Sequence, residues 1–270
     1  MQIVRTETPT GGPARTRREE IVQLLPMESE AEPEVYDDCS ESEGWPWDSK
    51  PSVCTWDVQV EALRQLIVPF EALDSQAADE QAAGDDDHGG VYRYAFSNVF
   101  LPTGKGSDDG DLNSSNFDRK MTDFRAKYFR GAPHPVAGGT RIMEAIEAGD
   151  AHYLGDAKHK GEFYDTPRAD RPVRARVVLT DGALSDAEEF RQYLEQATLS
   201  PKGYGSHGEW DEVWAICIIG EAGGGGKAAY QQYAEVAEAH PWVHPYYFED
   251  VVNPAEIAED MAVAVIPGLA

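Results

Sequence analysis

The fold class is decided by the stretch Arg174-Ala175-Arg176-Val177-Val178-Leu179-Thr180-Asp181-Gly182-Ala183-Leu184-Ser185-Asp186. Its apolar run ends in Thr-Asp-Gly, and a helix-start signal follows at Ser185 or Asp186. An unbroken apolar run between turn residues is typical of a strand covered on both faces, as in parallel sheets. Thr180 and Asp181 are therefore expected at the carboxyl end of a buried strand, where open α/β sheets place their ligand sites.

Strand and helix patterns alternate along the rest of the chain. Further strands are predicted at residues 21–25, 91–97, 214–219 and 243–248. Helix patterns fall between and around them, at residues 56–73, 117–129, 141–148, 186–196, 227–240 and 254–265. This order predicts an α/β fold with a doubly wound, mostly parallel central sheet and helices on both faces, Rossmann-like in its layers.

The composition suggests a single domain. Residues 1–20 mix Thr, Gly, Pro and Arg and are expected to form a polar arm. Residues 21–270 are expected to form one domain. Acidic segments near residues 28–55, 74–90 and 102–116 are interpreted as insertions into this domain rather than as linkers.

The charge balance limits the partners and the location of the protein. With 49 acidic and 23 basic residues, the chain has a net charge of −26. This surface repels phosphate backbones and anionic lipids, so no nucleic-acid and no membrane partner is expected, whereas cations and basic protein patches are compatible with it. We find no export signal and no apolar stretch long enough to span a bilayer, which favours a cytoplasmic protein.

Cysteine and histidine spacing predicts no metal site of the thiolate or imidazole type. No metal-ligand spacing is found for Cys39, Cys54 and Cys217, or for the histidines at positions 152, 159, 207, 240 and 244. Cys217 lies inside an apolar run and is expected to be a small core residue.

Short oxygen-bearing side chains occur in three separated segments. They are Asp38, Ser40 and Ser42 in the first segment, Thr140 in the second and Asp181 in the third. Hydroxyl and carboxylate oxygens are the donors that a small hard cation prefers, and Mg²⁺ takes about six of them at roughly 2.1 Å. The sequence therefore predicts a site for Mg²⁺, or for Mn²⁺ or Ca²⁺, where the three segments meet.

These residues resemble the metal-ion-dependent adhesion site of the von Willebrand factor type A (vWA) domain. That family has Asp-x-Ser-x-Ser after the first strand, a Thr in a later loop, and an Asp, often in Thr-Asp-Gly, after the fourth strand. The resemblance covers roughly residues 21–266 and is best from Gly138 onward; Phe96-Ser97 also looks like the family's usual Phe-Ser. Asp85-Asp86-Asp87 is similar to the bacterial tellurium-resistance-associated branch. The resemblance implies a ligand set of Asp38, Ser40, Ser42, Thr140 and Asp181.

The first loop departs from the family pattern and leaves two alignments open. In the family the Asp directly follows an apolar strand, whereas Asp38 follows the polar run 32–37, a poor candidate for a buried strand. Aligning the apolar run 21–25 instead puts Met27, Ser29 and Ala31 at the ligand positions. Such a site loses its acid and one hydroxyl. Spacing to the next helix favours Asp38, and strand composition favours Met27.

The expected function is that of a protein-binding module rather than an enzyme. Its metal would capture an acidic side chain of a partner protein. A first alternative is a metal-independent scaffold of the same fold with a degenerate site. A second is a metal-dependent phosphohydrolase, which is disfavoured because no Lys lies near Asp181 and no Asp-x-Asp motif follows an apolar strand.

Overall fold

The sheet confirms the predicted fold class. Within the residues that the computed structural model describes, seven strands form one sheet in the order β3-β2-β1-β5-β6-β7, and β4 also pairs with β2. They are β1 (Ala31–Asp38), β2 (Val91–Phe96), β3 (Phe100–Leu101), β4 (Asp111–Leu112), β5 (Val173–Thr180), β6 (Glu212–Gly220) and β7 (Val243–Glu249). The order β2-β1-β5-β6-β7 is parallel throughout, and the short β3 and β4 are antiparallel to β2.

The structure describes residues 31–78, 90–102, 111–136, 138–153, 173–196, 212–220, 225–250 and 253–265. The expected polar arm at residues 1–20, the predicted strand at 21–25, and Met27 and Ser29 lie outside these ranges. So do parts of the acidic segments predicted near 74–90 and 102–116.

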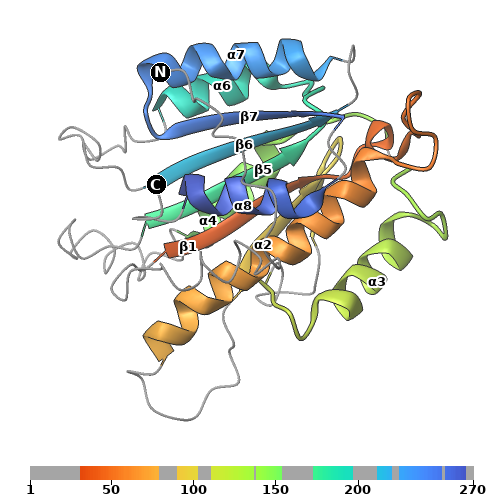
Figure 1. The fold of residues 1–270 in the computed structure, drawn as a ribbon, viewed down its shortest axis with the longest axis horizontal. Helices are drawn as coiled ribbons and strands as arrows, with labels where there is room; N and C mark the ends of the chain where they lie inside the picture. The colour runs from red at the N-terminus through yellow and green to blue at the C-terminus, as the bar shows by residue number, and fades with distance from the viewer. Residues whose placement is uncertain are drawn as a thin grey trace, which may run out of the picture.

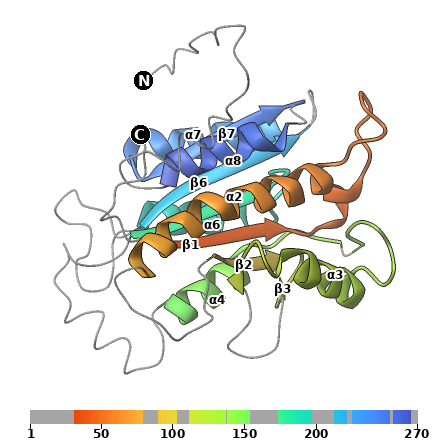
Figure 2. The ribbon, with the colours of Figure 1, turned by 60° about the horizontal axis from the view of Figure 1, so that its bottom comes forward.

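Helices cover both faces of the sheet, as a doubly wound fold requires. They are the 3-10 turn η1 (Glu41–Gly44), α2 (Thr55–Ala78), α3 (Phe117–Tyr128), α4 (Met143–Tyr153), α6 (Ala187–Gln196), α7 (Gly226–Ala239) and α8 (Pro254–Val265). One apolar core lies between the sheet and α2, α3 and α8, and a second between the sheet and α4, α6 and α7 (Figures 1 and 2). Pro69 lies inside α2, which continues past it to Ala78. Among the described helices, we find none with the length and apolar character to cross a membrane.

The central position of β1 corrects two expectations. The run 32–37 belongs to a strand after all, with residues 33–37 buried, and the segment 28–55 is not simply an insertion, because it contains β1 and η1. β1 pairs with β2 on one side and with β5 on the other. Ala31, a ligand position in the alternative alignment, pairs with Val173 at the amino end of β1. Asp38 is the last residue of β1, at its carboxyl end.

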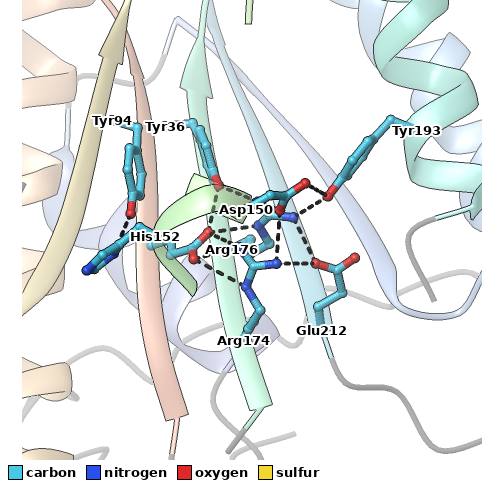
Figure 3. Close-up of polar contacts among 9 residues, drawn as sticks. Tyr36, Tyr94, Asp150, His152, Arg174, Arg176, Tyr193 and Glu212 are labelled. Atoms are coloured by element: carbon cyan, nitrogen blue, oxygen red, sulfur yellow. Dashed lines mark hydrogen bonds and ion pairs between the residues drawn. The ribbon is translucent and has the colours of Figure 1, made fainter. Parts of the chain in front are cut away.

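Arginines on the neighbouring strand explain why a polar β1 is buried. Glu34 is 2% exposed and accepts hydrogen bonds from Arg174 at 2.7 Å and from Arg176 at 2.9 Å. Both arginines also form ion pairs with Asp150 of α4 and Glu212 of β6 (Figure 3). Burial alone would raise the pKa of Glu34, but the two guanidinium groups outweigh it and lower that pKa to about 2. The acidic Glu34 can therefore be buried in β1 because its charge is paired with those of the two arginines.

Tyrosine hydroxyls complete this cluster, which we call the buried arginine network. Tyr36 donates to Glu34 at 2.6 Å and accepts a hydrogen bond from Arg176, and Tyr193 of α6 donates to Asp150 at 2.8 Å. The network thus joins β1, β5, β6, α4 and α6 in the second core (Figure 3). Its members are Glu34, Tyr36, Asp150, Arg174, Arg176, Tyr193 and Glu212.

Candidate metal centre

Asp38 is held at the carboxyl end of β1 by its own loop and by β5. Its side chain is fully buried. One carboxylate oxygen accepts the backbone N–H of Ser40 at 2.9 Å, and the other accepts the Thr180 hydroxyl at 2.8 Å. Because β1 and β5 are parallel neighbours, their carboxyl ends lie side by side, which brings these two residues together.

Glu43 of η1 joins Asp38 and Asp181 at this edge. Its Oε1 accepts the backbone N–H of Asp181 at 2.6 Å, whereas its Oε2 is buried and has no hydrogen-bond partner. One carboxylate oxygen from each of the three residues lies within 4.8 Å of the others. Asp181 is half-buried, and Asp38 and Glu43 are fully buried. We call these three residues the carboxylate site.

The sequence pattern does not single out Glu43. It belongs to an acidic run in which Glu41, two residues earlier, is exposed. Both are Glu residues in the same 3-10 turn, and no pattern in the run distinguishes the buried one.

The carboxylate site concentrates negative charge away from water. Burial, and next the charge of Asp181, raises the pKa of Asp38 to about 7. Burial, and next the charges of Asp38 and Asp181, raises the pKa of Glu43 well above its usual value. In the described part of the chain, no Lys or Arg forms an ion pair with any of the three. Buried charge without a partner is costly, so a bound cation would stabilise this arrangement.

The predicted hydroxyl ligands lie around the same edge. Ser40 is buried, Ser42 is half-buried, and their hydroxyl oxygens are 3.1 Å apart. Thr140 is buried, and its backbone carbonyl accepts the N–H of Ser185 in the turn after β5 at 2.7 Å. Among the described hydrogen bonds, neither the Ser42 nor the Thr140 hydroxyl bonds to the carboxylate site. The structure therefore brings carboxylate oxygens of Asp38 and Asp181 within 4.8 Å of each other. The predicted hydroxyl residues lie in the loops around them.

Asp186 fixes the Thr140 loop against the turn after β5. The sequence suggests it as a cap for α6, but its two carboxylate oxygens accept the N–H groups of Ile142 and Met143 at 3.1 and 3.0 Å. They therefore cap the start of α4, where free N–H groups need acceptors. Gly182, next to Asp181, has φ +90°, which favours glycine, and a Cβ there would lie 2.8 Å from that of Ala229.

A second set of buried contacts braces the site from the α2 face. Gln59 of α2 donates to the backbone carbonyl of Leu179 at 2.7 Å and to the Asp37 carboxylate at 3.2 Å. Arg93 of β2 pairs with the same carboxylate, with its Nε 2.9 Å away. These side chains thereby connect α2 and β2 to the carboxyl ends of β1 and β5, where Asp38 and Thr180 lie.

The donor set fits a hard divalent cation. Three carboxylates and two adjacent hydroxyls offer oxygen atoms only, the ligands that Mg²⁺, Mn²⁺ and Ca²⁺ prefer. The buried and unpartnered Glu43 oxygen is the observation that points to a missing positive partner.

Comparison with known proteins does not identify a family. No protein-family model matches the chain, and no curated protein matches it. A solved structure, the D319A mutant of the PilB minor pilin from Streptococcus sanguinis, is similar with a TM-score of 0.41 and 10% sequence identity. The match covers 87% of this chain and 60% of that chain. A likeness at this level carries no argument about function, which therefore has to be argued from the site.

Proposed function

We propose that this chain is a protein-binding module of the vWA kind that holds a divalent cation at the carboxyl edge of its sheet. Through the cation it would capture an acidic side chain of a partner protein. One observation carries the proposal: three carboxylates, two of them fully buried, converge within 4.8 Å with an unpartnered buried oxygen among them.

The acidic and the hydroxyl residues of the site would have different roles. Asp38 and Asp181 would bind the ion or hold its waters, while the Ser40 and Ser42 hydroxyls would be neutral donors that add no negative charge to it. Asp181 is half-buried and is the most accessible of the three carboxylates, so a partner carboxylate would approach next to it. The cation supplies Lewis acidity that polarises and holds the incoming carboxylate, and no covalent bond is made or broken.

Calorimetric titration with Mg²⁺ and Mn²⁺ tests cation binding. We expect the wild-type chain to bind both ions more tightly than millimolar and the Asp181→Asn variant to lose most of the heat. Asp123→Asn is the matched control, because Asp123 is an exposed acid on α3, far from β5 in the sequence. Absence of binding by the wild type, or equal binding by Asp181→Asn, contradicts the proposal.

A metal-independent scaffold is the second candidate, and the charge count favours it. A divalent ion on three ionised carboxylates leaves a net charge of −1, which repels a partner's acid unless one carboxylate withdraws. Partner capture distinguishes the two functions. If the cation captures the partner, proteins that the immobilised wild-type chain retains from a lysate in Mg²⁺ should be released by EDTA, and the immobilised Asp181→Asn variant should not retain them. Retention that neither EDTA nor Asp181→Asn changes supports the scaffold.

A further inference from the structure

A second group of potential metal ligands lies at the start of α2. Cys54 immediately precedes the helix and Asp57 is in its first turn, so their side chains share one side of the helix start. His134 comes from the segment after α3. The Cys54 sulfur, an Asp57 oxygen and a His134 nitrogen all lie within 4.8 Å of one another.

The measured separations match those around a tetrahedral ion. Asp57 Oδ2 is 3.3 Å from Cys54 Sγ and 3.3 Å from His134 Nε2. Ordinary zinc–ligand lengths in a tetrahedron put the oxygen about 3.5 Å from the sulfur and about 3.3 Å from the nitrogen. The three atoms are therefore spaced closely enough to ligate one ion with little side-chain movement.

The backbones that carry these ligands are fixed independently. Cys54 forms an isolated β-bridge with Pro46, and Asp57 is held by α2. His134 lies against the backbone of η1, since a Cβ added to Gly44 would be 2.7 Å from the His134 Cβ. Cys54 is buried, whereas the side chains of His134 and Asp57 are 35% and 55% exposed, so an ion can enter from solvent.

We propose that Cys54, Asp57 and His134 form a binding site for Zn²⁺ or a similar first-row transition metal. A thiolate, an imidazole and a carboxylate select such ions over Mg²⁺, which takes oxygen ligands, so this site differs in chemistry from the carboxylate site. On binding, the Cys54 thiol releases its proton to solvent as the sulfur–metal bond forms. Three protein ligands leave the fourth tetrahedral position to a water molecule.

The site would join α2 to the segment that follows α3. The ion would add a direct link between Cys54 and His134, which are distant in the sequence. Bound metal is therefore expected to stabilise the folded chain, by an amount that grows with the logarithm of the metal concentration divided by the dissociation constant.

Cobalt substitution tests this proposal, because a thiolate bound to Co²⁺ gives a near-ultraviolet charge-transfer band. Metal-free wild-type protein titrated with Co²⁺ should develop this band up to one ion per chain, and Zn²⁺ should abolish it. Cys54→Ser should lose the band. His134→Gln should weaken cobalt binding at least about tenfold, since even outer-shell partners of metal sites are worth that much.

Matched variants keep the result interpretable. Cys217→Ala removes another buried thiol, in β6, and should keep the band, as should Asp181→Asn at the carboxylate site. His134 is partly exposed, so His134→Gln should fold even where the buried Cys54→Ser fails to do so. The proposal is overturned if the wild type gives no band at saturating Co²⁺, if the band survives Cys54→Ser, or if His134→Gln binds cobalt as tightly as the wild type.

Discussion

At the scale of single residues, Glu43→Gln removes one ionisable carboxyl group from the carboxylate site while keeping the side-chain size. The Gln oxygen can still accept the Asp181 N–H, and its amide can donate to the neighbouring carboxylates. In EDTA at pH 8 we expect the free energy of unfolding to rise by about 1–3 kcal/mol, because an uncompensated buried group is removed. Urea unfolding measures this, with the exposed Glu41→Gln as control. A less stable Glu43→Gln protein under these conditions would argue against charge crowding at the site.

Glu34→Gln should have the opposite effect. It leaves Arg174 and Arg176 buried with one acid fewer, and we expect a loss of about 3–5 kcal/mol. The control, Glu188→Gln, breaks an exposed pair with Arg191 and should change stability far less, because exposed ion pairs contribute little. Urea denaturation of both variants gives the comparison.

The pH dependence of the Glu34 effect follows from its lowered pKa. The folded-state value of about 2 lies below the ordinary 4.5, so the stabilisation is complete above pH 4.5 and is lost as pH falls toward 2. The stability difference between wild type and Glu34→Gln should therefore shrink over this range. A difference that grows with acidification would show that Glu34 does not act through its charge.

Residue roles were the least predictable feature of the site. Asp38 and Asp181 could be proposed because each follows a strand end, a position that the sequence pattern indicates. Glu43 could not, since its burial depends on how η1 folds against the turn after β5. Asp186 is placed correctly at a helix start, but the N–H groups that it caps belong to α4.

At the scale of elements, α4 approaches β1 through Gly149. A Cβ at this position would collide with the Tyr36 hydroxyl and lie 3.3 Å from a Glu34 carboxylate oxygen. Gly149→Ala should therefore destabilise the protein by about 1–3 kcal/mol through overpacking, although Ala is the better helix former. Gly138→Ala, where the added Cβ meets nothing within 4 Å, is the matched control in thermal unfolding. Stabilisation by Gly149→Ala would mean that α4 does not pack this closely.

Element predictions succeeded where apolar periodicity was strong and failed at β1. The strands at 173–180 and 243–249 and the helices at 117–128 and 254–265 lie within a residue of their predicted ranges. The run 32–37 was expected to be a poor candidate for a buried strand because it is polar. Their compensating arginines lie in β2 and β5, so the pairing appears only once the strand order is known.

At the scale of the whole molecule, the net charge of −26 opposes compactness. Raising NaCl from about 0.01 M to about 0.1 M shortens the Debye length from about 30 Å to about 10 Å and screens this self-repulsion. We expect the thermal unfolding midpoint in EDTA to rise with salt, for the wild type and for Asp181→Asn alike. A midpoint that falls with added salt would contradict this.

A bound cation should add to the effect of salt. At equal ionic strength, Mg²⁺ at a hundred times its dissociation constant stabilises the folded state by about 2.7 kcal/mol. The wild type should show this further rise in midpoint and Asp181→Asn should not. Equal responses of the two proteins would assign the whole effect to screening.

The most direct test of the account is a crystal structure of the wild-type chain grown with Mn²⁺, with an anomalous difference map. The account predicts a peak at the carboxyl edge of the sheet, within ligand distance of carboxylate oxygens of Asp38, Glu43 or Asp181. A crystal equilibrated with saturating Mn²⁺ that shows no anomalous peak among these three residues would contradict the account.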